Sequence, residues 1–139
     1  MSRTIAVDVT QVGPSTSRVN ARSHSVLVDR PVEKGGDDRG PLGGELLLAS
    51  LGGCFMSTLL AAVRTRGAGV SDVRVSLEGT VGGTPERFEA IVMRVTATGG
   101  SEAELQKLLT VAERGCLVTN TLKDAVRLSV VLGEIRRSS

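Results

Sequence analysis

The chain has 139 residues and a formal net charge of +2, from 17 basic and 15 acidic side chains, which predicts one globular domain over residues 1–139. Aromatic residues make up 1% of the chain, which argues against proteins that bind nucleic acid by base stacking. One histidine and two cysteines 62 positions apart argue against a zinc site, and His24 is expected on a strand face. The sequence therefore predicts neither a metal ion nor another cofactor.

The N-terminal sequence passes directly from Met1 into alternating apolar residues, without the apolar core of a signal peptide. No uninterrupted apolar run reaches the roughly 18 residues of a membrane span. These two features predict a cytoplasmic protein without a membrane anchor. In that compartment a permanent disulfide is not expected, and a transient disulfide indicates redox chemistry.

The first third of the chain is predicted to be extended. Alternating apolar residues over 5–9 predict a strand, a turn rich in Gly, Pro and Ser follows at 13–17, and a second extended region covers 18–30. A polar, glycine-rich loop then spans 31–44. Loops of this length inside a compact domain are usually functional or mobile.

A long helix is predicted from Glu45 to about Gly67, because apolar residues recur at spacings of three and four. Its apolar circumference is wide, which predicts deep burial. Gly52 and Gly53 lie inside it at a cost of about 1 kcal/mol each relative to alanine. This cost indicates that another backbone, or a substrate, approaches the helix closely at this point.

The second half of the chain alternates strands and helices. Ser101 and Glu104 form a capping pattern that begins a helix, and Gly115 ends it just before Cys116. The predicted elements are, in order, strands over 70–81 and 88–98, a helix over 101–115, a short helix to about residue 122, and a strand over 126–132. This order predicts an α+β fold with antiparallel pairing.

Cys54 and Cys116 carry the chemistry that could define a function. Each follows a glycine beside a predicted helix, where a thiol can be reached and its pKa lowered. A peroxidatic cysteine attacks as a thiolate, and a second thiol then resolves its sulfenic acid as a disulfide. On this chemistry alone, two inert core cysteines are about equally well supported.

Activation of Cys54 requires a cation from another element, because Cys54 lies in the third turn of its predicted helix. Glu45, at the start of that helix, is placed to orient such a cation, although it serves equally as a first-turn acid that stabilises the helix dipole. The candidate cations are all upstream: Arg18, Arg22, Arg30 and Arg39.

Two motifs resemble those of the OsmC/Ohr family of osmotically inducible and organic-hydroperoxide-resistance proteins. The first is Gly40-Pro41-x-x-x-Glu45-Leu46-Leu47-Leu48-Ala49-x-Leu51-Gly52-Gly53-Cys54, and the second is Ala112-Glu113-x-x-Cys116-x-Val118-x-x-Thr121-Leu122. The similarity spans nearly the whole chain. It implies an OsmC-like fold, in which antiparallel twisted sheets wrap around a buried central helix in an intertwined homodimer with active sites at the subunit interface.

The resemblance implies a cysteine-based organic hydroperoxide reductase in oxidative-stress defence, regenerated by a dithiol that is of lipoyl type in the Ohr branch. Cys54 matches the peroxidatic cysteine, Cys116 the resolving cysteine, and Glu45 the glutamate that holds a catalytic arginine. In one branch that arginine occupies the loop where this chain has Lys34, flanked by arginines 30 and 39. In another it lies nearer the N-terminus, close to Arg18, which we take as the expected catalytic arginine.

The chain departs from the family pattern at two places. Leu117 stands where the family usually has proline after the second cysteine, and Gly43-Gly44 stand where proline often precedes the glutamate. These changes are expected to loosen the active-site loop. The alternative hypothesis is a non-catalytic dimer that binds a small apolar ligand at its interface and keeps both thiols reduced in the presence of peroxide.

Overall fold

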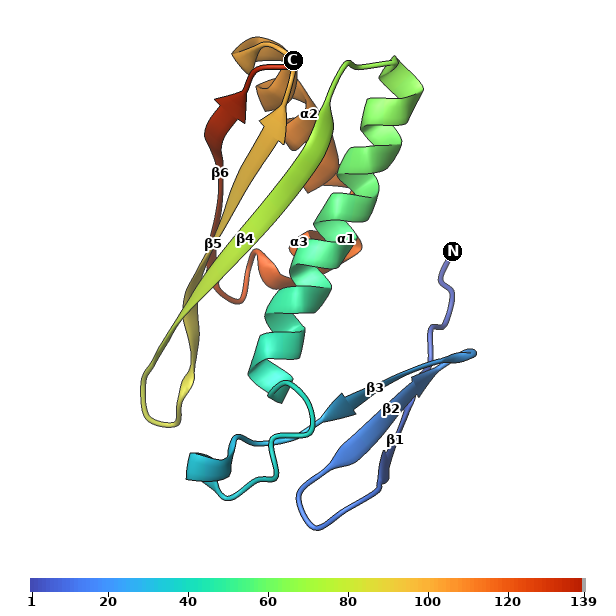
Figure 1. Cartoon of the computed structure of the whole chain (residues 1–139), viewed down its shortest axis with the longest axis vertical. Helices are drawn as coiled ribbons and strands as arrows, with labels where there is room; N and C mark the ends of the chain where they lie inside the picture. The colour runs from blue at the N-terminus through green and yellow to red at the C-terminus, as the bar shows by residue number, and fades with distance from the viewer. Residues whose placement is uncertain (139) are drawn as a thin grey trace. The chain divides into compact units, whose positions relative to one another are not determined.

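The computed structural model describes residues 1–138 and contains two compact units (Figure 1). The first unit is Met1–Leu47, and the second begins at Leu48. Each unit holds one three-stranded sheet. The single domain over residues 1–139 remains a prediction.

The sheet of the first unit is antiparallel and consists of β1 (Asp8–Gln11), β2 (Ser17–Ala21) and β3 (His24–Val28), followed by the 3-10 turn η1 (Val32–Lys34). Two strands thus replace the single extended region expected over 18–30. The reversal between them uses Arg22 at a φ of 56°. Because hairpin turns of this kind favour Asn, Asp or Gly, the sequence Arg22-Ser23 gave no recognisable signal.

The second unit contains a mixed sheet in the order β4-β5-β6 and the helices that connect its strands. The elements are α1 (Gly43–Arg66, whose first turns belong to the first unit), β4 (Ser71–Gly82), β5 (Arg87–Thr98), α2 (Glu102–Gly115), α3 (Leu117–Leu122) and β6 (Arg127–Arg136). Each predicted element of this half is present, and the Ser101 side chain caps α2 by accepting from the Glu104 N–H at 3.1 Å.

The pairing direction of β6 corrects the expectation of a purely antiparallel fold. β4 and β5 are antiparallel as predicted, but β6 runs parallel to β5. The chain between them passes through α2 and α3, and such a crossover returns it to the end of the sheet where β5 began. The α+β class is therefore confirmed, with one parallel strand pair.

Alternate residues of β5 face α1 and α2 and form the core with them. On β5 the buried side chains are Ile91, Met93, Val95 and Ala97, which share one face of the strand by the two-residue period. The helices contribute side chains at spacings of three and four: Leu51, Phe55, Leu59 and Ala62 from α1, and Leu105, Leu108, Leu109 and Ala112 from α2. This aliphatic core holds one phenylalanine, as the composition predicts.

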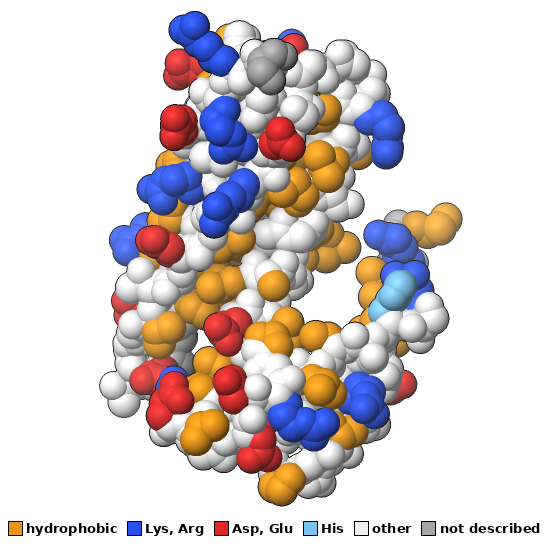
Figure 2. Space-filling view, viewed as in Figure 1, with side chains coloured by type: hydrophobic (Ala, Val, Ile, Leu, Met, Phe, Trp, Pro, Cys, Tyr) orange, Lys and Arg blue, Asp and Glu red, His pale blue; other side chains and the backbone are white. Residues whose placement is uncertain are grey.

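The α1 helix is less buried within one chain than its sequence predicts. In its most apolar 18-residue window, 22% of the residues are buried, and Leu60 remains 47% exposed. Hydrophobic side chains are visible along its course in Figure 2. The helix is also long and apolar enough to cross a membrane by length and composition alone, contrary to the sequence expectation, although core helices of soluble proteins meet the same criterion.

The glycine pair in α1 has two different environments. A Cβ at Gly52 would lie 2.6 Å from Leu77 Cδ1, so α1 can pack against β4 here because this residue has no side chain. The approaching group is thus a side chain rather than the backbone or substrate expected. A Cβ at Gly53 would meet no atom of the described residues within 4 Å, so that glycine stays open to another molecule.

Candidate functional site

Both cysteines are free thiols in the second unit. Cys116 belongs to the core cluster, and Cys54 packs against that cluster. Cys54 is half-buried on α1, whereas Cys116 is 0% exposed at the junction of α2 and α3. The Thr119 N–H donates to Cys116 Sγ over 3.4 Å, which makes the thiol the N-cap of α3. The expectation that both thiols can be reached is therefore wrong for Cys116 within one chain, because this residue is fully buried.

One threonine links the two cysteine segments. The Thr58 hydroxyl donates to the Cys54 carbonyl oxygen at 3.1 Å, one helical turn along α1. Its methyl group faces Gly115, where a Cβ would lie only 3.0 Å from Thr58 Cγ2. The turn of α1 that follows Cys54 thus packs against the residue that precedes Cys116. No sequence motif marks Thr58, because only tertiary packing reveals this contact.

Glu45 lies exposed in the first turn of α1 and completes the start of that helix. Its Oε1 accepts from the Leu42 N–H at 2.8 Å, the contact that a third-position glutamate makes in a capping box. Within residues 1–138 of one chain, this backbone group is the hydrogen-bond partner of Glu45, and no arginine donates to it. The first-turn role considered from the sequence is thus present, and the arginine-holding role remains a prediction.

The four candidate arginines all belong to the first unit and are all exposed. Arg18 lies on β2, where its Cα is paired with that of Leu27, and Arg22 occupies the β2–β3 turn. Arg30 and Arg39 lie at the two ends of the loop that precedes α1. Exposed guanidinium groups are available to a second molecule, so the choice of Arg18 remains a prediction.

A buried carboxylate, which sequence analysis missed, fixes the loop that carries two of these arginines. Asp29 is 3% exposed and accepts from the Thr16 hydroxyl at 2.7 Å, the Arg30 N–H at 2.7 Å and the Arg39 N–H at 3.2 Å. Burial alone would raise the pKa of Asp29, but these hydrogen bonds outweigh it and hold the pKa well below its usual range. Asp29 therefore joins the start and end of the 30–39 segment.

We expect the loss of this carboxylate to make stability less dependent on pH. A carboxyl whose pKa is lowered by folding stabilises the protein fully above its unfolded pKa of roughly 3.9, and that stabilisation disappears as the pH falls through the range below it. The urea midpoint of the wild type should therefore fall more between about pH 6 and about pH 2.5 than that of Asp29→Asn.

The matched control is Asp37→Asn, an exposed acid in the same loop, which should follow the wild-type pH profile. Equal loss of midpoint in the wild type and in Asp29→Asn would show that Asp29 does not stabilise the first unit as its hydrogen bonds indicate.

Comparison with known structures defines the fold class. A hypothetical protein from Aquifex aeolicus superposes with a TM-score of 0.84 at 18% identity, covering 99% of this chain and 100% of that one. An organic hydroperoxide resistance protein OsmC from Legionella pneumophila superposes with a TM-score of 0.74 at 19% identity, covering 96% of this chain and 100% of that one. An organic hydroperoxide resistance protein from Elizabethkingia anophelis superposes with a TM-score of 0.75 at 18% identity, covering 96% of this chain and 99% of that one. At these identities the likeness establishes the shared fold.

The family follows from the sequence itself. The model of the OsmC-like protein family matches residues 35–131, which include both cysteines and Glu45. This chain therefore belongs to the OsmC-like protein family, as its two cysteine motifs predict. No curated protein matches the chain in sequence.

Proposed function

We propose that this protein is a thiol-dependent peroxidase that reduces organic hydroperoxides, with Cys54 as the peroxidatic and Cys116 as the resolving cysteine. The observation that carries the proposal is the Thr58 contact, which brings the Cys54 turn of α1 against the residue preceding Cys116. Two cysteines separated by 61 residues thus share one core. A half-buried thiol that a peroxide can reach, and a buried thiol that packs in the same core, suit attack followed by resolution.

The proposed reaction balances in three steps. The Cys54 thiolate attacks the terminal peroxide oxygen, the O–O bond breaks, and after protonation the products are an alcohol and a Cys54 sulfenic acid. The Cys116 thiol then attacks that sulfur, forming the S–S bond and releasing water. An external dithiol reduces the disulfide by exchange and is itself oxidised. The sequence around Cys54 on α1 is largely apolar, so we expect a substrate with an apolar alkyl group.

A second subunit completes the proposed site. Each unit of the chain leaves apolar residues exposed: Leu60 at 47% on α1, Val9 at 60% on β1, and Ile5 at 71% and Val7 at 55% just before β1. Exposed apolar surface of this kind marks an interaction site. In the homodimer that we propose, the partner subunit covers these surfaces. It also supplies its Arg18, which Glu45 of the first subunit holds near Cys54. The solution mass should then be twice 14.5 kDa.

The substrate and reductant define the test of this proposal. We expect turnover of cumene hydroperoxide with reduced lipoamide to exceed turnover with glutathione by at least about tenfold, because a dithiol completes the exchange within one molecule. Turnover of cumene hydroperoxide should likewise exceed that of hydrogen peroxide, because the latter has no apolar group. Loss of NADH coupled to lipoamide reduction measures the turnover of the two peroxides. Direct loss of peroxide measures the turnover with glutathione. Absence of turnover with any reductant would favour the non-catalytic, ligand-binding dimer.

A further inference from the structure

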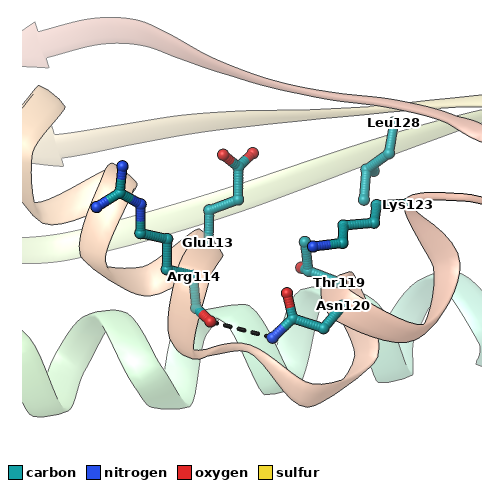
Figure 3. A pocket seen from close by; sticks show the side chains of 6 residues that line it. All are labelled: Glu113, Arg114, Thr119, Asn120, Lys123 and Leu128. Carbon is teal, nitrogen blue, oxygen red and sulfur yellow. Dashed lines mark hydrogen bonds between the residues drawn. The ribbon is translucent and has the colours of Figure 1, made fainter.

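A polar pocket lies at the junction of α2 and α3, on residues that the proposed peroxidase chemistry does not use (Figure 3). Its volume is about 240 Å³, so it suits a small ligand. It is lined by Glu113, Arg114, Thr119, Asn120, Lys123 and Leu128. All six residues belong to the second unit.

One residue that lines the pocket, Thr119, has a buried hydroxyl group without a hydrogen-bond partner among the described residues. Thr119 is 2% exposed, and its Oγ1 makes no hydrogen bond to any residue described. Buried polar groups in native proteins are normally satisfied, and an unsatisfied one costs stability. Lys123 points toward Thr119 in Figure 3 and is itself exposed, so its side chain can move to admit a ligand group to that hydroxyl. Thr119 Oγ1 thus has an unused capacity to donate.

The hydrogen-bonding groups of the pocket divide into acceptors and donors. The Asn120 amide nitrogen already donates to the Arg114 carbonyl oxygen at 3.0 Å, which leaves the Asn120 carbonyl oxygen as an acceptor, and the Glu113 carboxylate is a second acceptor of the lining. The Lys123 ammonium and the Thr119 hydroxyl are the donors. In Figure 3 Glu113 stands on the α2 side and Lys123 on the α3 side, while the Arg114 guanidinium points away from both.

We propose that this pocket binds a small zwitterionic amino acid. Its ammonium group would donate to Glu113 and Asn120, and its carboxylate would accept from Lys123 and Thr119. Leu128 provides an apolar wall for a short aliphatic side chain. A phosphate ion is a poorer match, because its negative charge would be repelled by the Glu113 carboxylate. The proposal is independent of peroxidase activity, although Thr119 also donates its N–H to Cys116.

Three probes that differ by one group separate the contributions of the two charges. L-Alanine carries both groups, propionate lacks the ammonium, and ethylammonium lacks the carboxylate. Binding to the ¹⁵N-labelled full-length protein is followed by the amide shifts of residues 113–123. L-Alanine should bind at least about tenfold more tightly than either fragment, because each charged hydrogen bond contributes separately. Equal binding of propionate would overturn the zwitterion assignment, and so would unchanged shifts at saturating L-alanine.

Charge-removing variants should then show a crossed pattern. Lys123→Gln should weaken L-alanine and propionate but leave ethylammonium unchanged, whereas Glu113→Gln should weaken L-alanine and ethylammonium but leave propionate unchanged. Lys107→Gln, exposed on α2 outside this pocket, is the matched control and should bind all three as the wild type does. A variant pair that weakens all three probes equally would contradict the proposed orientation.

Thr119→Val provides a readout that a purely structural role would not produce. Valine has the shape of threonine without the hydroxyl, so the melting temperature without ligand should rise while the affinity for L-alanine falls. A fall in the melting temperature would mean that the hydroxyl stabilises the free protein, and the ligand assignment of Thr119 would be wrong. Unchanged L-alanine affinity in a folded Thr119→Val protein would be equally contrary to the proposal.

Discussion

Replacement of Cys54 by serine is expected to reduce peroxide turnover about a thousandfold or more, because removal of a nucleophile costs an enzyme most of its rate enhancement. A serine hydroxyl remains protonated at neutral pH, whereas the reaction requires a thiolate to attack the O–O bond. Cys54 is half-buried and packs beside the core without belonging to its fully buried set, so the variant should fold. The measurement is the steady-state consumption of cumene hydroperoxide with a dithiol reductant.

The second cysteine provides the internal comparison for this prediction. Cys116→Ser should still consume one equivalent of peroxide in a single turnover, leaving a Cys54 sulfenic acid that dimedone traps. It should fail only in repeated turnover with a dithiol. Ser76→Ala, on the exposed face of β4, is the control and should keep the wild-type rate. Wild-type turnover by Cys54→Ser would contradict the assigned chemistry.

Replacement of Phe55 by alanine is expected to lower the free energy of unfolding by about 3–5 kcal/mol, the usual cost of deleting a buried phenylalanine ring. Phe55 is 0% exposed and is the largest fully buried side chain. The chain has only two phenylalanines and no tryptophan or tyrosine. The other described residues of the core cluster around Phe55 are not aromatic. The cavity left by the substitution would remain largely unfilled.

Urea unfolding at one fixed protein concentration measures this loss, since association contributes to the stability of a dimer. Val81→Ala, at a position 54% exposed on β4, is the matched control and should change the free energy of unfolding by less than about 1 kcal/mol. If Phe55→Ala were as stable as the control, the core assigned to α1 and β5 would be incorrect.

Local signals in the sequence predicted most of the second unit. The helix expected from Glu45 to about Gly67 occupies Gly43–Arg66, and the cap at Ser101 is present. These features depend on residue spacing and on contacts three or four positions apart, which a sequence displays directly. The parallel direction of β6 was not predicted, because strand pairing joins distant residues and periodicity carries no sign of direction.

The candidate site was predictable only in part. The cysteine motifs identified the family, yet the burial of Cys116 depends on its capping contact with Thr119. Thr58 packs against Gly115, and Asp29 accepts hydrogen bonds from the backbone N–H groups of Arg30 and Arg39. Neither contact forms a short sequence motif. In the proposed site the arginine would come from a second subunit, and an interface between copies brings together residues that no single chain does.

The most direct test of the peroxidase proposal is a stoichiometric titration of the reduced protein with cumene hydroperoxide, followed by peptide mass spectrometry. We predict that each subunit consumes one equivalent of peroxide and loses both thiols. The mass of one linked peptide should then identify a bond between Cys54 and Cys116. Retention of both thiols with unconsumed peroxide would contradict the proposal and favour a ligand-binding protein of the same fold.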